Sequence, residues 1–154
     1  MVWTADNSLN SLQNVLFACT HNSIRSPIAA ALGNQLFGNA IQFASVGVTA
    51  NDVSPFAIAI MDEIGLDVAS HQSRVFSDLD NEPCDLIISL TPEAQHHAVE
   101  LTRAGTCEAI YWPTLDPSLA HGSRTTILDS FREVRDSLRN NIEAYFGQAP
   151  AAAQ

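Results

Sequence analysis

Lysine is absent from this chain of 154 residues, so its seven basic side chains are all arginines, against 17 aspartates and glutamates. The formal net charge is −10. Such an acidic surface argues against nucleic acid and against an anionic membrane as partners, because both are polyanions. An anion-binding site in this chain must therefore depend on local donors and not on the field of the whole molecule.

Long apolar runs and paired cysteines are also missing. No uninterrupted stretch reaches the roughly 18 apolar residues that span a bilayer, and no basic segment followed by an apolar one indicates a secretory signal. Cysteine occurs three times, as Cys19, Cys84 and Cys107, and an odd number does not suit a disulfide framework. The sequence thus predicts a cytoplasmic location, where thiols stay reduced.

The most informative stretch runs from Asn14 to Gly38. A short apolar run ends at Cys19, five residues lead to Arg25, and Ser26-Pro27 opens an alanine-rich segment. This order predicts a strand, a tight loop and a helix, with Ser26 as the helix cap. The backbone N–H groups of such a loop can surround an oxyanion at the positive end of the helix. They also favour a reactive thiolate, while the arginine fork can hold two phosphate oxygens.

Four apolar stretches typical of buried strands alternate with helical patterns along the rest of the chain. The predicted strands are 14–20, 41–48, 85–90 and 108–112, and the predicted helices are 26–37, 55–64, 92–104 and 126–145. This alternation predicts an α/β fold with a four-stranded parallel sheet and helices on both faces, a flavodoxin-like three-layer sandwich. We expect one domain over residues 14–146, a leader over 1–13 outside its core, and a disordered tail over 147–154.

Most of the chain, residues 14–146, resembles the low-molecular-weight protein-tyrosine-phosphatase family, whose signature is a strand followed by C-x5-R-[ST]-P. The resemblance implies that Cys19 is the nucleophile, that Arg25 binds phosphate, and that Asp116, in Asp116-Pro117, is the general acid. From the chain alone, Asp52 is the runner-up for the acid. The phosphate-binding loop implied in this way comprises Thr20, His21, Asn22, Ser23, Ile24, Arg25 and Ser26. Hydrogen bonds from residues that include Asn22, Ser45 and His71 are expected to support it.

The chain departs from the family pattern at four places. His21 stands where glycine is usual, so the loop has to tolerate a side chain there, and histidine tolerates positive φ moderately well. Ile24 replaces a second loop cysteine. Ser118-Leu119 replaces two aromatics that wall the phosphotyrosine slot, so we expect poor discrimination between aryl and alkyl phosphates unless another side chain, such as Trp112, forms that wall. Tyr111-Trp112 is more similar to the arsenate-reductase branch.

The resemblance implies a cysteine-dependent phosphomonoester hydrolase that works through a thiophosphate and requires no metal or cofactor. Its substrate would be a phosphorylated protein or a small phosphomonoester, with inorganic phosphate or arsenate as further ligands. One alternative is a thiol-dependent arsenate reductase on the same fold. The segment after the third strand, LTPEAQHHAVEL, lacks the cysteines usual in that branch, so an external thiol would be needed. The other alternative is a non-catalytic binder of phosphate or of a phosphoprotein.

The remaining cysteines and a histidine pair have plainer interpretations. Cys84 and Cys107 stand at the starts of predicted strands, which is typical of buried structural thiols. His96-His97 lies on a helix, where adjacent positions point apart, so we interpret the pair as a surface feature and predict no metal site.

Overall fold

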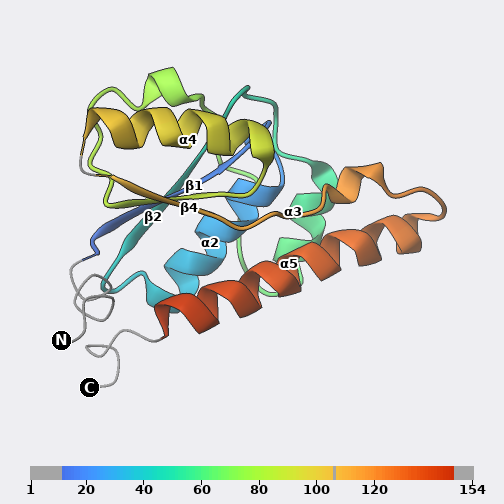
Figure 1. Cartoon of the computed structure of the whole chain (residues 1–154). Helices are drawn as coiled ribbons and strands as arrows, with labels where there is room; N and C mark the ends of the chain where they lie inside the picture. The colour runs from blue at the N-terminus through green and yellow to red at the C-terminus, as the bar shows by residue number, and fades with distance from the viewer. Residues whose placement is uncertain (1–11, 106, 148–154) are drawn as a thin grey trace.

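The computed structural model describes residues 12–105 and 107–147 and contains a four-stranded sheet (Figure 1). All the strand pairs are parallel, and the spatial order is β2-β1-β3-β4. The strands are β1 (Asn14–Cys19), β2 (Gln42–Gly47), β3 (Leu86–Ser89) and β4 (Glu108–Tyr111). The predicted α/β class with a parallel sheet is confirmed, and each strand begins and ends within one residue of its expected bounds.

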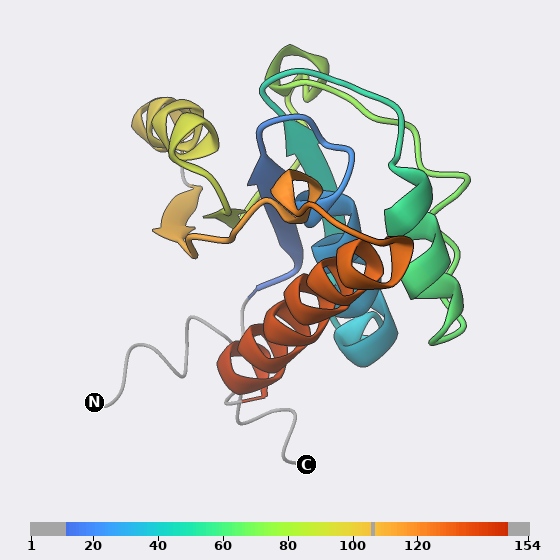
Figure 2. The same cartoon turned by 90° about the vertical axis from the view of Figure 1, so that its right-hand side faces the viewer.

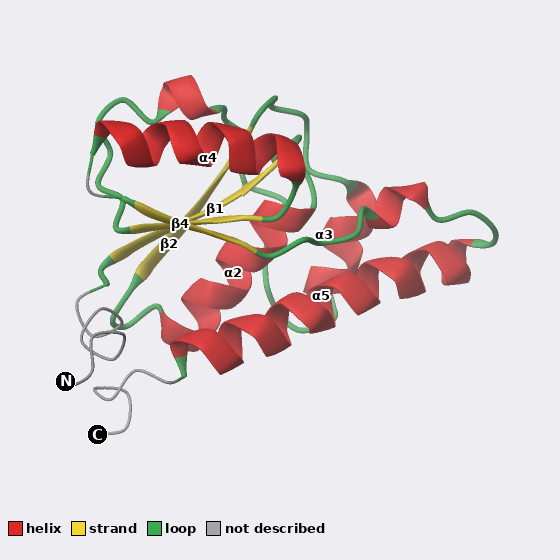
Figure 3. Ribbon diagram, viewed as in Figure 1, coloured by secondary structure: helices red, strands yellow, loops and turns green. Residues whose placement is uncertain are grey.

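Helices cover both faces of the sheet and complete three layers (Figure 3). In this view, helices pack against the sheet from below and from above. The helices are α2 (Arg25–Phe37), α3 (Pro55–Asp62), α4 (Pro92–Ala104), which lies above, and α5 (Arg124–Phe146). Two short 3-10 helices, η1 (Phe76–Asp78) and η2 (Pro117–Leu119), lie in the connections.

The alternation of side chains along β1 explains how the layers are held. Val15, Phe17 and Cys19 belong to the apolar cluster that includes α2 and α5, whereas Leu16 and Ala18 belong to the cluster on the α4 side. Successive residues of a strand point to opposite faces, so a central strand buried on both sides is apolar throughout. The side chain of Cys19 therefore leaves the sheet on the α2 side, where the loop after β1 turns back.

Three helices, α2, α3 and α4, start beside a Ser-Pro or Thr-Pro pair, and in two of them the serine or threonine is the N-cap. Ser54 and Thr91 accept hydrogen bonds from the backbone N–H groups of Phe56 and Ala94, both at 3.2 Å, and each cap precedes a proline. The expectation that Ser26 caps α2 is wrong, because the N-cap is Ile24, which makes no side-chain cap bond. The hydroxyl of Ser26 is used inside the loop instead.

The structure describes only small parts of the predicted leader, residues 1–13, and of the predicted tail, residues 147–154. Leu12 packs against the core, and the backbone N–H of Gln13 donates to Asp85 Oδ2 at 3.0 Å. The rest of the predicted leader, residues 1–11, and nearly all of the predicted tail, residues 148–154, lie outside the described residues. Within the described ranges, no helix combines the length and the apolar character needed to cross a membrane.

Candidate active site

The loop between β1 and α2 lies at the point where the strand order of the sheet reverses. β2 is on one side of β1 and β3 is on the other. The connection after β1 therefore runs towards β2, the connection after β3 runs the opposite way towards β4, and ligands of open α/β sheets bind at such a point. Figure 2 looks onto the carboxyl-terminal edge of the sheet, where η2, in orange, crosses in front of this loop, in blue. The expected phosphate loop therefore meets a segment almost a hundred residues later in the chain.

The thiol of Cys19 is buried in this loop and contacts one hydroxyl. Its side chain is 2% exposed, and Sγ lies 3.0 Å from Ser26 Oγ. The side-chain amide of Asn22 donates to the same Oγ at 2.8 Å. Because Ser26 Oγ already accepts this bond, its own proton can be donated to Sγ, and such a bond stabilises negative charge on sulfur.

The side chain of Asn22 holds the loop from behind. Asn22 is fully buried, and its amide donates to Ser26 Oγ and to Ser45 Oγ, the latter at 3.0 Å. Its Oδ1 accepts from His71 Nε2 at 3.1 Å and from the backbone N–H of Arg74 at 3.0 Å. The structure thus brings Asn22, Ser45 and His71 together, as the family resemblance implies.

Two residues that follow His71 in the chain, Ser73 and Arg74, also support the loop, and the sequence did not predict this role for them. The hydroxyl of Ser73 donates to the backbone carbonyl of Asn22 at 2.8 Å, and Arg74 Nε donates to the carbonyl of Ser45 at 3.1 Å. Burial lowers the pKa of His71 below 6.5, although its hydrogen bond to Asn22 opposes this, and the charge of Arg74 lowers it further. This shift favours the neutral form of His71, in which Nε2–H donates to Asn22.

Positive φ occurs at Asn22 and not at His21, so the backbone expectation for His21 is wrong. Asn22 has a φ of 52°, and asparagine adopts this left-handed conformation more easily than most residues. His21 is exposed, with Nδ1 2.9 Å from Thr49 Oγ1. A glycine is needed instead at Gly47, at the end of β2, because the backbone there passes close to the loop. A Cβ on Gly47 would lie 2.7 Å from the backbone nitrogen of Asn22.

Arg25 and Asp116 face each other across the opening of the loop. Arg25 is 9% exposed, and its Nη1 donates to the carbonyl of Thr114 at 3.0 Å. Its Nη2 lies 3.8 Å from Asp116 Oδ2. The other carboxylate oxygen of Asp116 accepts from the backbone N–H and hydroxyl of Ser118, at 2.9 and 2.6 Å.

The charge state of Asp116 follows from these neighbours. Partial burial raises the pKa of its carboxyl, but the two Ser118 hydrogen bonds and the positive charge of Arg25 outweigh burial and hold the pKa below 3.8. A dianion bound at Arg25 would compete for the guanidinium and repel the carboxylate, and both effects raise the pKa of Asp116. The carboxyl is therefore placed to gain a proton when an anion occupies the loop.

A cavity of about 420 Å³ connects these groups, and we name it the Cys19 cavity. Asp52 does not line it. Trp112 does not line it either, because it packs between Phe17 and Tyr145, so Trp112 does not wall the substrate slot. One wall of the cavity is apolar and joins α3 to α5, so no local sequence pattern predicts it. The lining residues are Cys19, His21, Ser23, Ile24, Arg25, Asn51, Ser54, Pro55, Phe56, Asp116, Ser118, Ala120, Ile127 and Phe131.

The other two thiols lie at the opposite edge of the sheet. Cys84 lies two residues before the amino end of β3, and Cys107 immediately precedes that of β4. Each is half-buried, not buried as expected. The two thiols interact with each other, and this interaction raises the pKa of Cys84 and lowers that of Cys107. Cys19 is level with Leu90 in the register of β1 with β3, which places Cys84 about 20 Å from it at ~3.3 Å per residue.

Comparison with known proteins identifies relatives along almost the whole chain. The sequence pattern of the family described as "Low molecular weight phosphotyrosine protein phosphatase" matches residues 14–152. The arsenate reductase of Halalkalibacterium halodurans is 30% identical over 133 residues, which are 85% of this chain and 93% of that protein.

Solved structures show the same architecture. An arsenate reductase in the phosphate-binding state is 27% identical, with a TM-score of 0.68 over 90% of this chain and 99% of the other. The tyrosine phosphatase AmsI of Erwinia amylovora is 17% identical, with a TM-score of 0.74 over 90% and 94% of the two chains, and this likeness concerns the fold alone.

Proposed function

Because this chain belongs to the low-molecular-weight phosphotyrosine protein phosphatase family of enzymes, we propose that it is a cysteine-dependent phosphomonoester hydrolase. The observation that carries this proposal is the convergence of Cys19, Arg25 and Asp116 on one cavity. A nucleophile, a phosphate-binding fork and a carboxyl that can exchange a proton are the groups this reaction needs. A phosphorylated protein or a small phosphomonoester would be the substrate.

In the first step, the thiolate of Cys19 attacks phosphorus in line with the leaving oxygen. Arg25 and the backbone N–H groups of the loop hold the equatorial oxygens and stabilise the charge that develops on them. Oδ1 of Asp116 is occupied by Ser118, so the proton for the leaving oxygen would be carried by Oδ2. A phosphorus–sulfur bond forms as the phosphorus–oxygen bond breaks.

In the second step, water attacks the thiophosphate and Asp116 accepts its proton. Phosphate is then released and the Cys19 thiolate returns, stabilised by the Ser26 hydroxyl. Asn22, Ser45 and His71 are assigned the role of keeping the loop in this shape, since they meet directly behind it. The residues of the chain provide every group that these two steps require.

Arsenate reduction is the second candidate, and it is favoured by the names of the relatives, which include the Halalkalibacterium halodurans protein. An arsenate adduct on Cys19 has to be resolved by another thiol. Cys84 and Cys107 lie at the far edge of the sheet, so in the described part of the chain no second thiol can reach Cys19 without unfolding. The reductase would therefore depend on an external thiol, whereas the phosphatase needs only water.

Two parallel assays distinguish the candidates. We expect purified protein to hydrolyse p-nitrophenyl phosphate and to be inactive in arsenate reduction coupled to a small thiol, with the variant Cys19→Ser as the control in both. Arsenate reduction without phosphate-ester turnover would overturn the proposal. A non-catalytic binder would do neither, yet would bind phosphate in calorimetry. The proposal includes a cytoplasmic location, based on the odd number of cysteines.

A further inference from the structure

The guanidinium of Arg124 lies over an aromatic ring in the wall of the Cys19 cavity. Its Cζ is 5.4 Å from the centroid of Phe56, and Phe56 lines the cavity. Arg124, Ile127 and Phe131 occupy positions i, i+3 and i+7 of α5, which share one face of a helix, and the latter two also line the cavity. Because Arg124 itself is exposed, it continues this wall outward to the rim.

Among the described residues, Arg124 differs from every other arginine in having no carboxylate partner. The six others, which form ion pairs, are Arg25, Arg74, Arg103, Arg132, Arg135 and Arg139. In a chain with 17 acidic side chains and seven arginines, an arginine that has a carboxylate partner is the usual case. The contact with Phe56 holds the guanidinium by a cation–π interaction, which uses the face of the ion and leaves its N–H groups available to donate to an anion.

The charges around the cavity determine where a second anion of the substrate can be bound. Arg25 and the loop amides are assigned to the phosphate, and Asp116 repels other anions from the η2 side. His21 lies at the mouth on the side of Thr49, to which it is hydrogen-bonded. Arg124 is therefore the permanently charged cation that a group beside the phosphate would meet on the α5 side.

We propose that Arg124 binds a carboxylate next to the phosphorylated residue of the substrate, so that acidic phosphopeptides are preferred. This inference rests on the proposed phosphatase activity and assigns its substrate class.

The test compares two phosphotyrosine peptides that differ only in having aspartates or asparagines beside the phosphotyrosine. At low salt the wild type is expected to show a kcat/KM about two- to fivefold higher for the aspartate peptide, as is typical of one exposed ion pair. This ratio should fall towards one in Arg124→Gln. It should also fall in 1 M salt, where the Debye length is about 3 Å.

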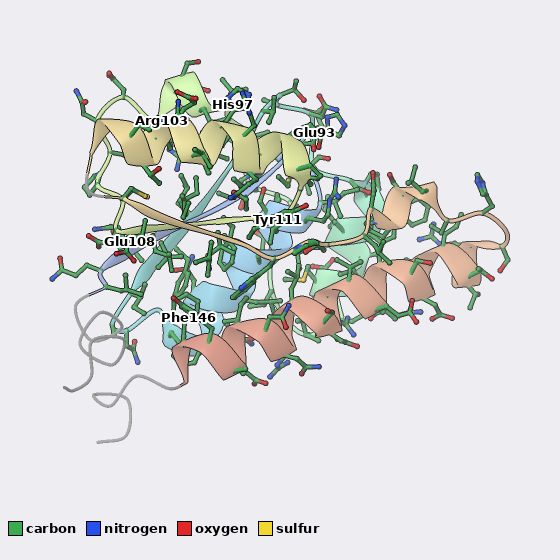
Figure 4. All side chains as sticks on the ribbon, in the orientation of Figure 1. Glu93, His97, Arg103, Glu108, Tyr111 and Phe146 are labelled. Carbon is green, nitrogen blue, oxygen red and sulfur yellow. The ribbon has the colours of Figure 1, made fainter. Side chains whose placement is uncertain are left out.

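Matched variants exclude general effects of charge or folding. Arg103→Gln removes the same charge from the far end of α4 (Figure 4) and should keep the wild-type ratio. Arg124→Glu should reverse the preference, in favour of a peptide with lysines in place of the aspartates. Phe56→Leu, which keeps an apolar wall without a ring, should reduce the ratio in part.

Several outcomes would overturn the inference. Equal losses on both peptides in Arg124→Gln would make Arg124 structural, and loss of the preference in His21→Gln instead would assign the anion to His21. Hydrolysis of both peptides by the wild type with equal kcat/KM would overturn the inference but leave the phosphatase activity in place. Failure of the wild type to hydrolyse either peptide or p-nitrophenyl phosphate would overturn both proposals.

Discussion

Replacing Asp116 by asparagine removes the proton from the proposed mechanism while keeping the local structure. Oδ1 of asparagine can accept both Ser118 hydrogen bonds that Asp116 accepts, and asparagine is as good a helix cap for η2 as aspartate. Its amide nitrogen takes the place of Oδ2, which lies 3.8 Å from Arg25 Nη2. The cavity should therefore keep its shape, and a change in rate can be attributed to the lost acid.

The expected loss depends on the leaving group. General acid catalysis contributes about 10²- to 10⁴-fold, or about 2.7 to 5.4 kcal/mol of barrier. An alkyl phosphate has a poor leaving oxygen and should lose this whole factor in Asp116→Asn. p-Nitrophenyl phosphate has a good leaving group and should lose less than about tenfold. The measurement is kcat/KM on both substrates for wild type and variant.

The pH profile provides a second measurement of the same assignment. Asp116 must be protonated to act, and its pKa is held below 3.8 in the empty site, so the protonated fraction falls as pH rises. The wild-type profile on an alkyl phosphate should therefore be bell-shaped with an acidic optimum, and its basic limb should vanish in Asp116→Asn. Ser118→Ala removes a hydrogen bond that lowers this pKa and should move the limb to higher pH. Equal losses on both leaving groups with an unchanged basic limb would refute the assignment.

The remaining predictions concern the loop and its supports. Cys19→Ser should abolish turnover while isothermal calorimetry still detects phosphate binding; residual hydrolysis would point to another nucleophile. Arg25→Lys should lower kcat/KM by about 10²- to 10³-fold, because a point charge cannot replace the bidentate fork, and near-wild-type kinetics would contradict the geometry. The folded-state pKa of His71 lies below 6.5, so its contribution to stability should be complete above pH 6.5 and be lost as pH falls below it. Urea unfolding of wild type and His71→Gln from pH 8 to 5 measures this, and identical pH slopes would be the contrary result. Peroxide should over-oxidise Cys19, and mass spectrometry should find no disulfide from it to Cys84 or Cys107; such a disulfide would revive the reductase candidate.

The sequence by itself determined the features that depend on neighbouring residues. The apolar run before Cys19, the Ser-Pro pair after Arg25 and the capped prolines of α3 and α4 specify local structure, because strand and helix periods are read over a few residues. Four strands that alternate with four helices predict a parallel sheet. The positions of Cys19 and Arg25 at the end of a strand and the start of a helix, and the edge of the sheet at which they lie, were all predictable for this reason.

The tertiary structure decided which distant side chains meet. Phe56 and Arg124 come from separate helices, and only the packing of α3 against α5 places them on one wall of the Cys19 cavity. The separation of Cys19 from Cys84 follows from strand direction and register, which spacing along the chain does not encode. Positive φ was assigned to Asn22 because its side chain finds four partners there, from the loop, β2 and the segment before η1. These contacts join segments that are distant in the sequence and form only when the order of the strands in the sheet is fixed. A local sequence pattern therefore does not predict them.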